Sequence, residues 1–274
     1  MLFMSQEVTF EAALSQFLDM RCLNRKPKTV KFYNEVRRVM LKAASAVKDK
    51  PCAQFLPADL LALATLLERQ CPSRWNQICA ALGAILPHLP KLKRKRLNCR
   101  EFTPPSPEQF GAFLLSLDNL PRTHAGLITR FYCFTGLRFE EGMSLKWSNV
   151  HPERIDVPAA HTKSGKGRSV PLVPGARDVL EQLRALKVPG DFVLPQQHPR
   201  KAMEIAARSA GLGHWSPHLC RHYFATMCIQ SGVDIPTVAR WLGHQDGGAL
   251  LSKTYFHLAD EHSQIMAQRV RIAA

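Results

Sequence analysis

A dense group of basic side chains stands in the stretch SPHLCRHYFAT, residues 216–226. His218, Arg221 and His222 fall within five positions, between a proline and an apolar run. If the stretch is helical, the three share one face, because residues three and four apart are neighbours on a helix surface. Taken alone, such a face could hold a metal, exchange protons or bind an anion.

Four further side chains of related chemistry stand at separate places. They are Arg138, which follows FTG at an expected helix start; Lys163, beside a glycine-rich turn; His244, which ends WLGH; and Tyr255, in SKTYFH. Arginine forks hold phosphate oxygens in pairs and stabilise charge that develops in a transition state. Histidine and lysine move protons, and an activated tyrosine can attack phosphorus. The set suits covalent phosphoryl transfer without a metal.

Motifs of other chemistries are missing from the sequence. Glu140 and Glu141 are adjacent, but no DxD or ExxE array is present to bind magnesium. SGKGRS lacks the spacing of a phosphate-binding P-loop, and the chain has no GxSxG elbow or kinase signature. The eight cysteines form no CxxC pair, so we expect reduced structural thiols rather than a zinc site.

Each candidate also has a structural explanation when it is taken singly. A lone arginine after a helix-ending glycine is usually a surface residue, and a lone tyrosine near a C-terminus usually packs. We interpret His222, Trp215 and Trp241 as packing or supporting groups. The chemical interpretation depends on the ordered combination of the others.

The elements that must position these side chains predict two domains joined by a linker. Residues 1–90 contain four apolar-periodic segments, with Thr9 as a cap, Pro57 near a helix start and Pro87 at a helix end. They predict a compact all-α module. Residues 91–105 carry a basic run followed by prolines, which is typical of a linker.

Residues 106–274 predict a mainly α-helical domain with a small antiparallel β-sheet. Ser106, Pro107 and Gln109 form a capping-box pattern at its start, and Gly136 ends an apolar helix. Strands are expected in RIDVP and in AAHTKSGKGRSVPL, the latter as a hairpin that turns at residues 164–167. Further helices are expected near 175–187, 200–211, 217–231, 235–242 and 258–270.

The net charge of +15 is concentrated in the first domain. Residues 1–100 contain 18 Lys and Arg against 7 Asp and Glu, whereas residues 101–274 contain 19 against 15. This distribution favours binding of a polyanion such as DNA or RNA. The sequence has no secretory signal and no apolar stretch that could span a bilayer, so we expect a cytoplasmic protein without a membrane partner.

In this order, the candidate residues resemble the tyrosine recombinase family, which includes the phage integrases. FTGLRFEEGMSLKWSNV is similar to the first arginine motif, with Arg138 and its acidic companion Glu141. HTKSGKGRSVPL is similar to the hairpin of the catalytic lysine, best matched by Lys163, with Lys166 as the alternative. HLCRHYFATMCIQSGVDIPTVARWLGH is similar to the second motif and TYFH to the nucleophile motif; they supply His218, Arg221, His244 and Tyr255.

The resemblance covers residues 105–260 and has two departures from the family pattern. Cys220 stands where the family often has an acidic or other residue. The loop QDGGALLSK, between His244 and Tyr255, is longer than usual. Residues 1–90 match only in their helical character.

The resemblance implies a helical core-binding domain, a catalytic domain and a site-specific recombinase of double-stranded DNA. Tyr255 would form a 3′-phosphotyrosyl bond and release a 5′-hydroxyl, with no cofactor and no metal. Arg138 and Arg221 would hold the phosphate with support from His244. Lys163 would be the general acid, and His218 would assist proton transfer at the tyrosine.

The resemblance also implies an assembly. The two domains would enclose the duplex, and four protomers would form a tetramer on two sites from a free monomer or dimer, with accessory proteins as further candidate partners. The segment after Tyr255 would pack on a neighbour. Two alternatives remain: a type IB topoisomerase, which shares the chemistry but does not exchange partners, and a DNA-binding protein that has lost catalysis.

Overall fold

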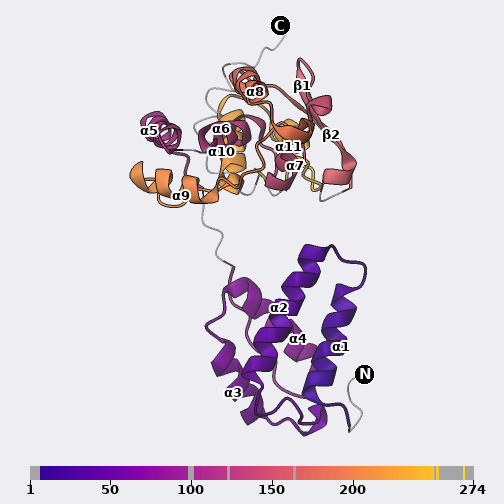
Figure 1. The fold of residues 1–274 in the computed structure, drawn as a ribbon. Helices are drawn as coiled ribbons and strands as arrows, with labels where there is room; N and C mark the ends of the chain where they lie inside the picture. Colours follow the sequence, from indigo (N-terminus) through magenta and orange to yellow (C-terminus); the bar gives the residue numbers. More distant parts are fainter. Residues whose placement is uncertain are drawn as a thin grey trace. The chain divides into compact units, whose positions relative to one another are not determined.

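Local signals begin each α-helix that the structure describes in the first hundred residues (Figure 1). Thr9 caps α1 (Phe10–Cys22) by accepting a hydrogen bond from the backbone N–H of Ala12 at 3.3 Å. Helices α2 (Pro27–Ala43), α3 (Pro57–Leu67) and α4 (Pro72–Ile85) each place proline in the first turn, where its missing N–H costs no intrahelical bond. Pro87 follows the end of α4, as predicted.

The computed structural model describes residues 7–97, 102–121, 124–162, 165–249, 251–252 and 268. The chain divides into two units, residues 1–100 and residues 101–274. In unit 1, α1 packs against α2 and α4 over a core of fully buried side chains that includes Phe10, Phe55 and Ile78. The predicted all-α character of this part is therefore confirmed.

The first part of the predicted basic linker is docked on unit 1. Asn76 in α4 donates from Nδ2 to the carbonyl of Lys95 at 2.9 Å and accepts from the Lys95 backbone N–H at 2.8 Å. Trp75 donates from Nε1 to the carbonyl of Lys93 at 2.9 Å. The ammonium of Lys95 lies 5.1 Å from the centre of the Trp75 ring. These contacts fix the backbone of the segment, while most of its basic side chains stay exposed.

Unit 2 is mostly helical, with one short sheet in the part that the structure describes (Figure 1). Its α-helices and strands are α5 (Pro107–Asp118), α6 (Ala125–Thr135), α7 (Phe139–Met143), β1 (Arg154–Val157), β2 (Arg168–Pro171), α8 (Ala176–Ala185), α9 (Arg200–Ser209), α10 (Pro217–Gln230) and α11 (Ile235–Leu242). This arrangement confirms the predicted fold class. The helix expected near 258–270 lies outside the described residues, apart from Gln268, which is in a turn.

Helix caps in unit 2 follow the sequence pattern closely. Ser106 accepts from the Gln109 N–H at 3.2 Å, and the Gln109 side chain accepts from the Ser106 N–H at 3.1 Å, which completes the predicted capping box. Gly136 ends α6 with a φ of 62°, in the left-handed region that favours glycine. A side chain there would also collide with the Phe224 ring.

The strand prediction needs one correction. The sheet is a two-stranded antiparallel pair of β1 with β2, in which Val157 faces Arg168 and Arg154 faces Pro171. AAHTKSGKGRSVPL therefore does not form a hairpin by itself, because residues 159–161 are a single turn of 3₁₀-helix. Strand β1 ends at Val157, and Pro158 leads directly into this turn.

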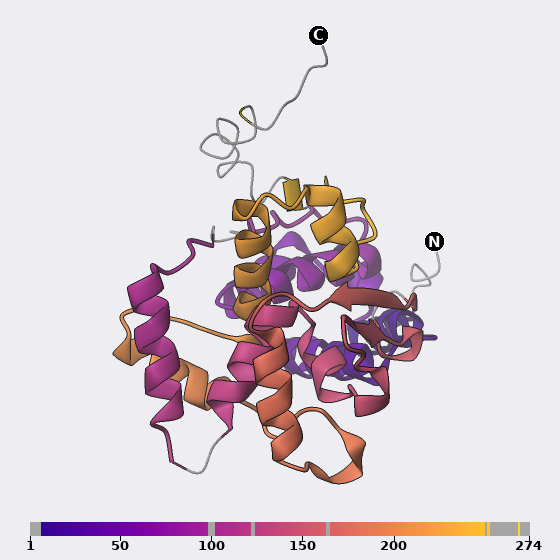
Figure 2. The same cartoon turned by 90° about the horizontal axis from the view of Figure 1, so that it is seen from above.

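Helix α6 is the centre of the unit 2 core. It packs against α5, α8 and α10, and Phe131, Tyr132 and Cys133 are buried on it. A second buried cluster joins α10 to α11. Figure 2 shows these two helices, drawn in gold, beside the rose-coloured strands, and α11 contacts β2. None of the helices that the structure describes is long and apolar enough to cross a membrane.

Candidate active site

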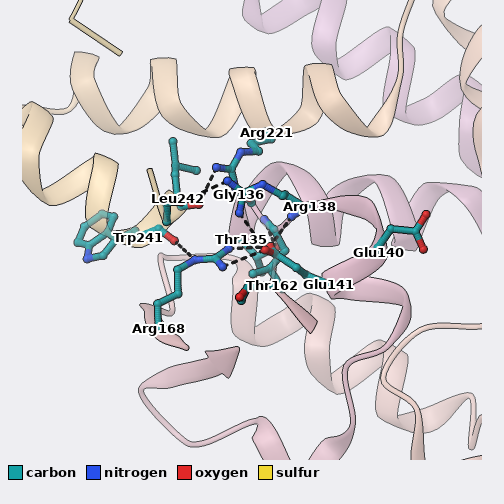
Figure 3. A network of polar contacts seen from close by, with 12 residues as sticks. Thr135, Gly136, Arg138, Glu140, Glu141, Thr162, Arg168, Arg221, Trp241 and Leu242 are labelled. Carbon is teal, nitrogen blue, oxygen red and sulfur yellow. Dashed lines mark hydrogen bonds and ion pairs between the residues drawn. The ribbon is translucent and has the colours of Figure 1, made fainter. Parts of the chain in front are cut away.

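The C-terminus of α11 brings the two predicted arginines together (Figure 3). Arg221, on α10, donates from Nη2 to the carbonyl of Leu242 at 2.6 Å and from Nη1 to the carbonyl of Gly136 at 2.8 Å. Arg138, the residue before α7, donates from Nη2 to the carbonyl of Gly243 at 3.3 Å. The last carbonyls of a helix have no intrahelical donor, so they accept bonds from cations that lie at this end.

Glu141 binds Arg138, as its predicted role of acidic companion requires. Its carboxylate accepts from Arg138 Nη1 at 2.9 Å and from the Arg138 backbone N–H at 2.9 Å. The Glu141 side chain is only 1% exposed. Burial by itself raises the pKa of this carboxyl, but hydrogen bonds and charge from Arg168 and Arg138 outweigh it and lower the pKa to about 2. Glu141 is therefore a buried anion at neutral pH.

Arg168 is a site residue that the sequence analysis missed. It begins β2 and donates from Nη1 and Nη2 to the two carboxylate oxygens of Glu141, at 3.0 Å and 2.7 Å. Its Nε donates to the carbonyl of Trp241 at 2.6 Å. In sequence it looks like an ordinary basic residue beside a glycine-rich turn. A signal was nevertheless present. Arg168 stands two positions before Val170 in an expected strand, and residues two apart in a strand lie on the same face, so Arg168 shares the face of this apolar residue.

The predicted histidines of α10 contact each other. The Nε2 atoms of His218 and His222 are 3.2 Å apart, so one ring donates and the other accepts. Burial and then the charge of Arg221 lower the pKa of His218 below 6.5. Burial and then His218 lower the pKa of His222 to about 4. Both rings are thus neutral at pH 7, and the Phe102 ring packs against His222 with its centre 5.8 Å away.

His244 lies directly after the turn that receives the arginines. Its backbone N–H donates to the carbonyl of Ala239 at 2.9 Å, which ties the residue to α11. Its Nδ1 is buried and has no hydrogen-bond partner among the residues that the structure describes. Burial and then Arg221 lower the pKa of His244 to about 4. At pH 7 the ring is neutral and can donate one hydrogen bond without adding charge.

Two of the six predicted catalytic residues, Lys163 and Tyr255, lie outside the described residues. The alternative lysine, Lys166, is exposed on the loop between β1 and β2. The other four approach one another: Arg138 and Arg221 bind the end of α11, His244 follows it, and His218 lies one helical turn before Arg221.

The residues interpreted as supporting groups take part in packing. Trp215 is buried, contacts Phe102 and Phe113, and donates from Nε1 to the sulfur of Cys220 at 3.2 Å. The departure from the family pattern at Cys220 is thus a buried thiol on α10. Trp241 contributes its backbone carbonyl to Arg168 and packs beside the α10–α11 cluster.

The arrangement suits an anion with several oxygens better than a metal ion. Three guanidinium groups, of Arg138, Arg168 and Arg221, lie around the end of α11 with the neutral imidazole of His244. Glu141 is already paired with two of these arginines. Within the described ranges, no three His, Cys, Asp or Glu side chains are grouped as metal ligands. Guanidinium groups hold phosphate oxygens through paired bonds. The described part of the site therefore fits a phosphate diester.

Comparison with protein families gives a match over the same region. The model of the phage integrase family matches residues 112–262. The tyrosine recombinase XerC of Pseudomonas aeruginosa (strain LESB58) is 31% identical over 159 residues, which are 53% of this chain and 50% of that protein. XerC of Pseudomonas fluorescens (strain Pf0-1) is 33% identical over 159 residues, 53% of this chain and 51% of that protein. The chain spans about half the length of these curated relatives.

Solved structures are similar over most of the chain. A lambda integrase dimer bound to a COC′ core site matches with a TM-score of 0.74 and 14% identity, covering 90% of this chain and 77% of that one. The Tn1549 transposon integrase in complex with transposon right end DNA matches with a TM-score of 0.71 and 14% identity, covering 96% and 99%. At these identities the similarity shows a shared fold.

Proposed function

The chain belongs to the phage integrase family, and we propose that it is a site-specific DNA recombinase that joins strands through a 3′-phosphotyrosine. The observation that carries the proposal is the convergence of Arg138, Arg221 and His244 at one end of α11. These residues are far apart in sequence and have the types that a phosphoryl-transfer site needs. The XerC relatives and the DNA-bound integrase structures support the same activity.

The proposed role of the arginines is to hold the scissile phosphate and stabilise the charge of its transition state. The Arg138 side chain is 31% exposed, so its guanidinium can reach a bound backbone. Arg221 is 5% exposed and is fixed by two carbonyls, which orients the rest of its fork. His244 would donate one hydrogen bond as a neutral ring. Preorganised donors of this kind are the largest contribution in many phosphoryl-transfer sites.

The proposed chemistry balances its protons without a cofactor. The Tyr255 oxygen attacks phosphorus, and the neutral ring of His218 accepts the phenolic proton. The bond from phosphorus to the 5′-oxygen breaks, and Lys163 supplies a proton to that oxygen. A 5′-hydroxyl from the partner DNA strand then gives its proton to the neutral Lys163 and attacks the phosphotyrosine. The bond from phosphorus to Tyr255 breaks, and His218 returns the proton to the phenolic oxygen, so the number of phosphodiester bonds is conserved.

Two other tyrosines are poor nucleophiles for physical reasons. Burial raises the pKa of Tyr132 and of Tyr223, and Tyr132 donates its hydroxyl to the carbonyl of Phe139 at 2.8 Å. The fourth tyrosine, Tyr33, belongs to α2 in unit 1. Tyr255 is the remaining tyrosine of the chain.

We assign DNA-backbone binding to unit 1 and catalysis to unit 2. The docked segment of unit 1 exposes Lys91, Lys93, Arg94 and Arg96 on an ordered backbone, which suits successive phosphates. Because strand exchange needs four strand ends, we expect four protomers on two sites; a lambda integrase tetramer bound to a Holliday junction is among the similar structures. A DNA substrate agrees with the expected cytoplasmic location.

Covalent trapping tests the proposal. A duplex nicked beside the scissile phosphate loses its 5′ leaving fragment, so a tyrosine recombinase accumulates as a DNA adduct. We expect the native chain and Tyr223→Phe to form the adduct, and Tyr255→Phe to bind DNA without forming it. An adduct with Tyr255→Phe would contradict the assigned nucleophile. Two labelled sites distinguish strand exchange from a topoisomerase, which would relax supercoils without giving a recombinant.

A further inference from the structure

We propose that Arg168 is a positioning residue of this active site, which sets the orientation of the Arg138 guanidinium through Glu141 and holds the turn before His244 through Trp241. The proposal rests on the proposed function. Three consecutive carbonyls carry the argument, because Trp241, Leu242 and Gly243 each accept from a different arginine. Figure 3 shows the contacts of Trp241 with Arg168 and of Leu242 with Arg221. Arg168 is the one of the three to which the family resemblance assigns no role.

The contacts at Glu141 show how Arg168 acts on Arg138. A carboxylate with one arginine partner commonly forms a fork with both terminal nitrogens. Here Arg168 uses both of its terminal nitrogens on the two oxygens, and Arg138 contributes only Nη1 to one of them. The Nη2 of Arg138 turns instead to the carbonyl of Gly243. Arg168 therefore limits how Arg138 can pair with Glu141.

Burial separates the role of Arg168 from that of a phosphate ligand. Its side chain is 7% exposed, and Glu141 is 1% exposed, so this pair lies beneath the surface that a DNA backbone could reach. Arginine keeps its charge at any ordinary pH, so a buried arginine needs permanent partners. Its Nε and both terminal nitrogens are engaged with the protein. Arg168 thus acts through its neighbours.

The turn before His244 is shaped to accept Arg168. Gly243 has a φ of 70°, and a β-carbon there would lie 2.9 Å from the Cδ atom of Arg168. The guanidinium therefore passes close to the backbone at this point, and its Nε fixes the carbonyl of Trp241 at 2.6 Å. Since His244 directly follows this turn, a shift of Arg168 would move the imidazole as well as Arg138.

A double-mutant cycle on adduct formation tests this role. The substrate is the nicked site with sulfur in place of the 5′-bridging oxygen, because a thiolate leaves without a proton and keeps weak variants measurable. We expect Arg168→Met to lower the adduct rate at least tenfold in the native background. In an Arg138→Ala background we expect a clearly smaller further loss, because only the route through Trp241 to His244 remains and residues that act through one another are not additive. As a check on the substrate, Lys163→Ala should form little adduct on the ordinary nicked site and more on the sulfur-containing one, because a thiolate needs no proton from the lysine.

Controls keep the result specific. Arg154→Met removes an exposed arginine of β1, the strand that pairs with β2. Arg154 binds Asp156 and not Glu141, so this variant should leave the adduct rate unchanged. Arg168→Lys keeps the charge without the fork and should show the same defect with DNA binding retained, at a temperature where its melting curve shows the variant folded. An equal loss from Arg168→Met in both backgrounds would reveal a general structural role and overturn the proposal, as would no loss at all. A native chain that forms no adduct would overturn the proposed function and this role with it.

Discussion

Arg221 donates to the carbonyl of Leu242 at 2.6 Å, so the second predicted catalytic arginine is held by the end of the helix that precedes His244. The same guanidinium donates to the carbonyl of Gly136, at the end of α6. Two helix C-termini, with their partial negative charge, thus stabilise this buried cation. The position of Arg221 depends on both helix ends.

The first prediction concerns Arg221→Lys. A lysine ammonium lacks the fork and cannot donate to both carbonyls in the same geometry. We expect adduct formation to fall at least 100-fold and the free energy of unfolding to fall by about 1–3 kcal/mol, because a buried carbonyl loses its donor. Urea unfolding and the trapping assay measure the two effects. Arg208→Lys, at an exposed position of α9, is the control. If Arg221→Lys cleaved DNA at the native rate, the fork would not be needed.

The second prediction compares two glycines with similar backbone angles. Gly243 and Gly247 have φ values of 70° and 63°, so alanine strains the backbone similarly at both. A β-carbon at Gly243 would contact Arg168, whereas a β-carbon at Gly247 would have no atom within 4 Å. Both variants should lose about 1 kcal/mol of stability from the backbone. Only Gly243→Ala should also lower the adduct rate, and an equal effect of both on that rate would contradict the packing of Arg168 in this turn.

The third prediction is a loss of stability at mildly acidic pH. The pKa values of His222 and His244 are about 4 in the folded chain, against 6.5 for an ordinary histidine. Between these values the unfolded chain binds protons that the folded chain excludes. The contribution of the two histidines to the free energy of unfolding is therefore at its maximum above pH 6.5 and decreases as the pH falls to 4. With solvent screening, we expect about 1 kcal/mol from each ring.

Urea unfolding at about pH 7.5 and about pH 4.5 measures this effect. His244→Gln should reduce the difference between the two conditions, and His214→Gln, at an exposed position, is the control. Glu141 contributes elsewhere, because its lowered pKa of about 2 removes stability only as the pH falls below 4.5. A pH profile that stays the same in His244→Gln would contradict the buried, neutral state of this ring.

The helix ends were predictable because their signals are local. Thr9, Ser106 and Gly136 act on backbone groups within a few residues, so the sequence contains both partners of each interaction. The first strand was also located correctly, in RIDVP, and β2 lies within the second segment predicted as strand, but the pairing of the two was not predicted. Which segment pairs with RIDVP depends on residues outside it, and a short glycine-rich segment offered a turn that looked sufficient by itself.

The site was predictable in its residue types but not in its internal contacts. The order of Arg138, Arg221 and His244 along the chain indicated one phosphate site, and the structure brings these three to one helix end. Arg168 was missed because its partners, Glu141 and Trp241, are far from it in sequence. A buried carboxylate that needs two cations can be identified only when its burial is known.

The last prediction concerns the basic segment docked on α4. Asn76 exchanges two hydrogen bonds with the backbone of Lys95, so Asn76→Ala should release residues 93–96 and cost about 1–2 kcal/mol. Trypsin should then cut this segment faster. Salt-dependent DNA binding should weaken, with a shallower slope, because fewer basic side chains are held in place for phosphates. Gln77→Ala, at an exposed position on the same helix, is the matched control. An unchanged salt slope in Asn76→Ala would remove this segment from the proposed DNA-binding surface.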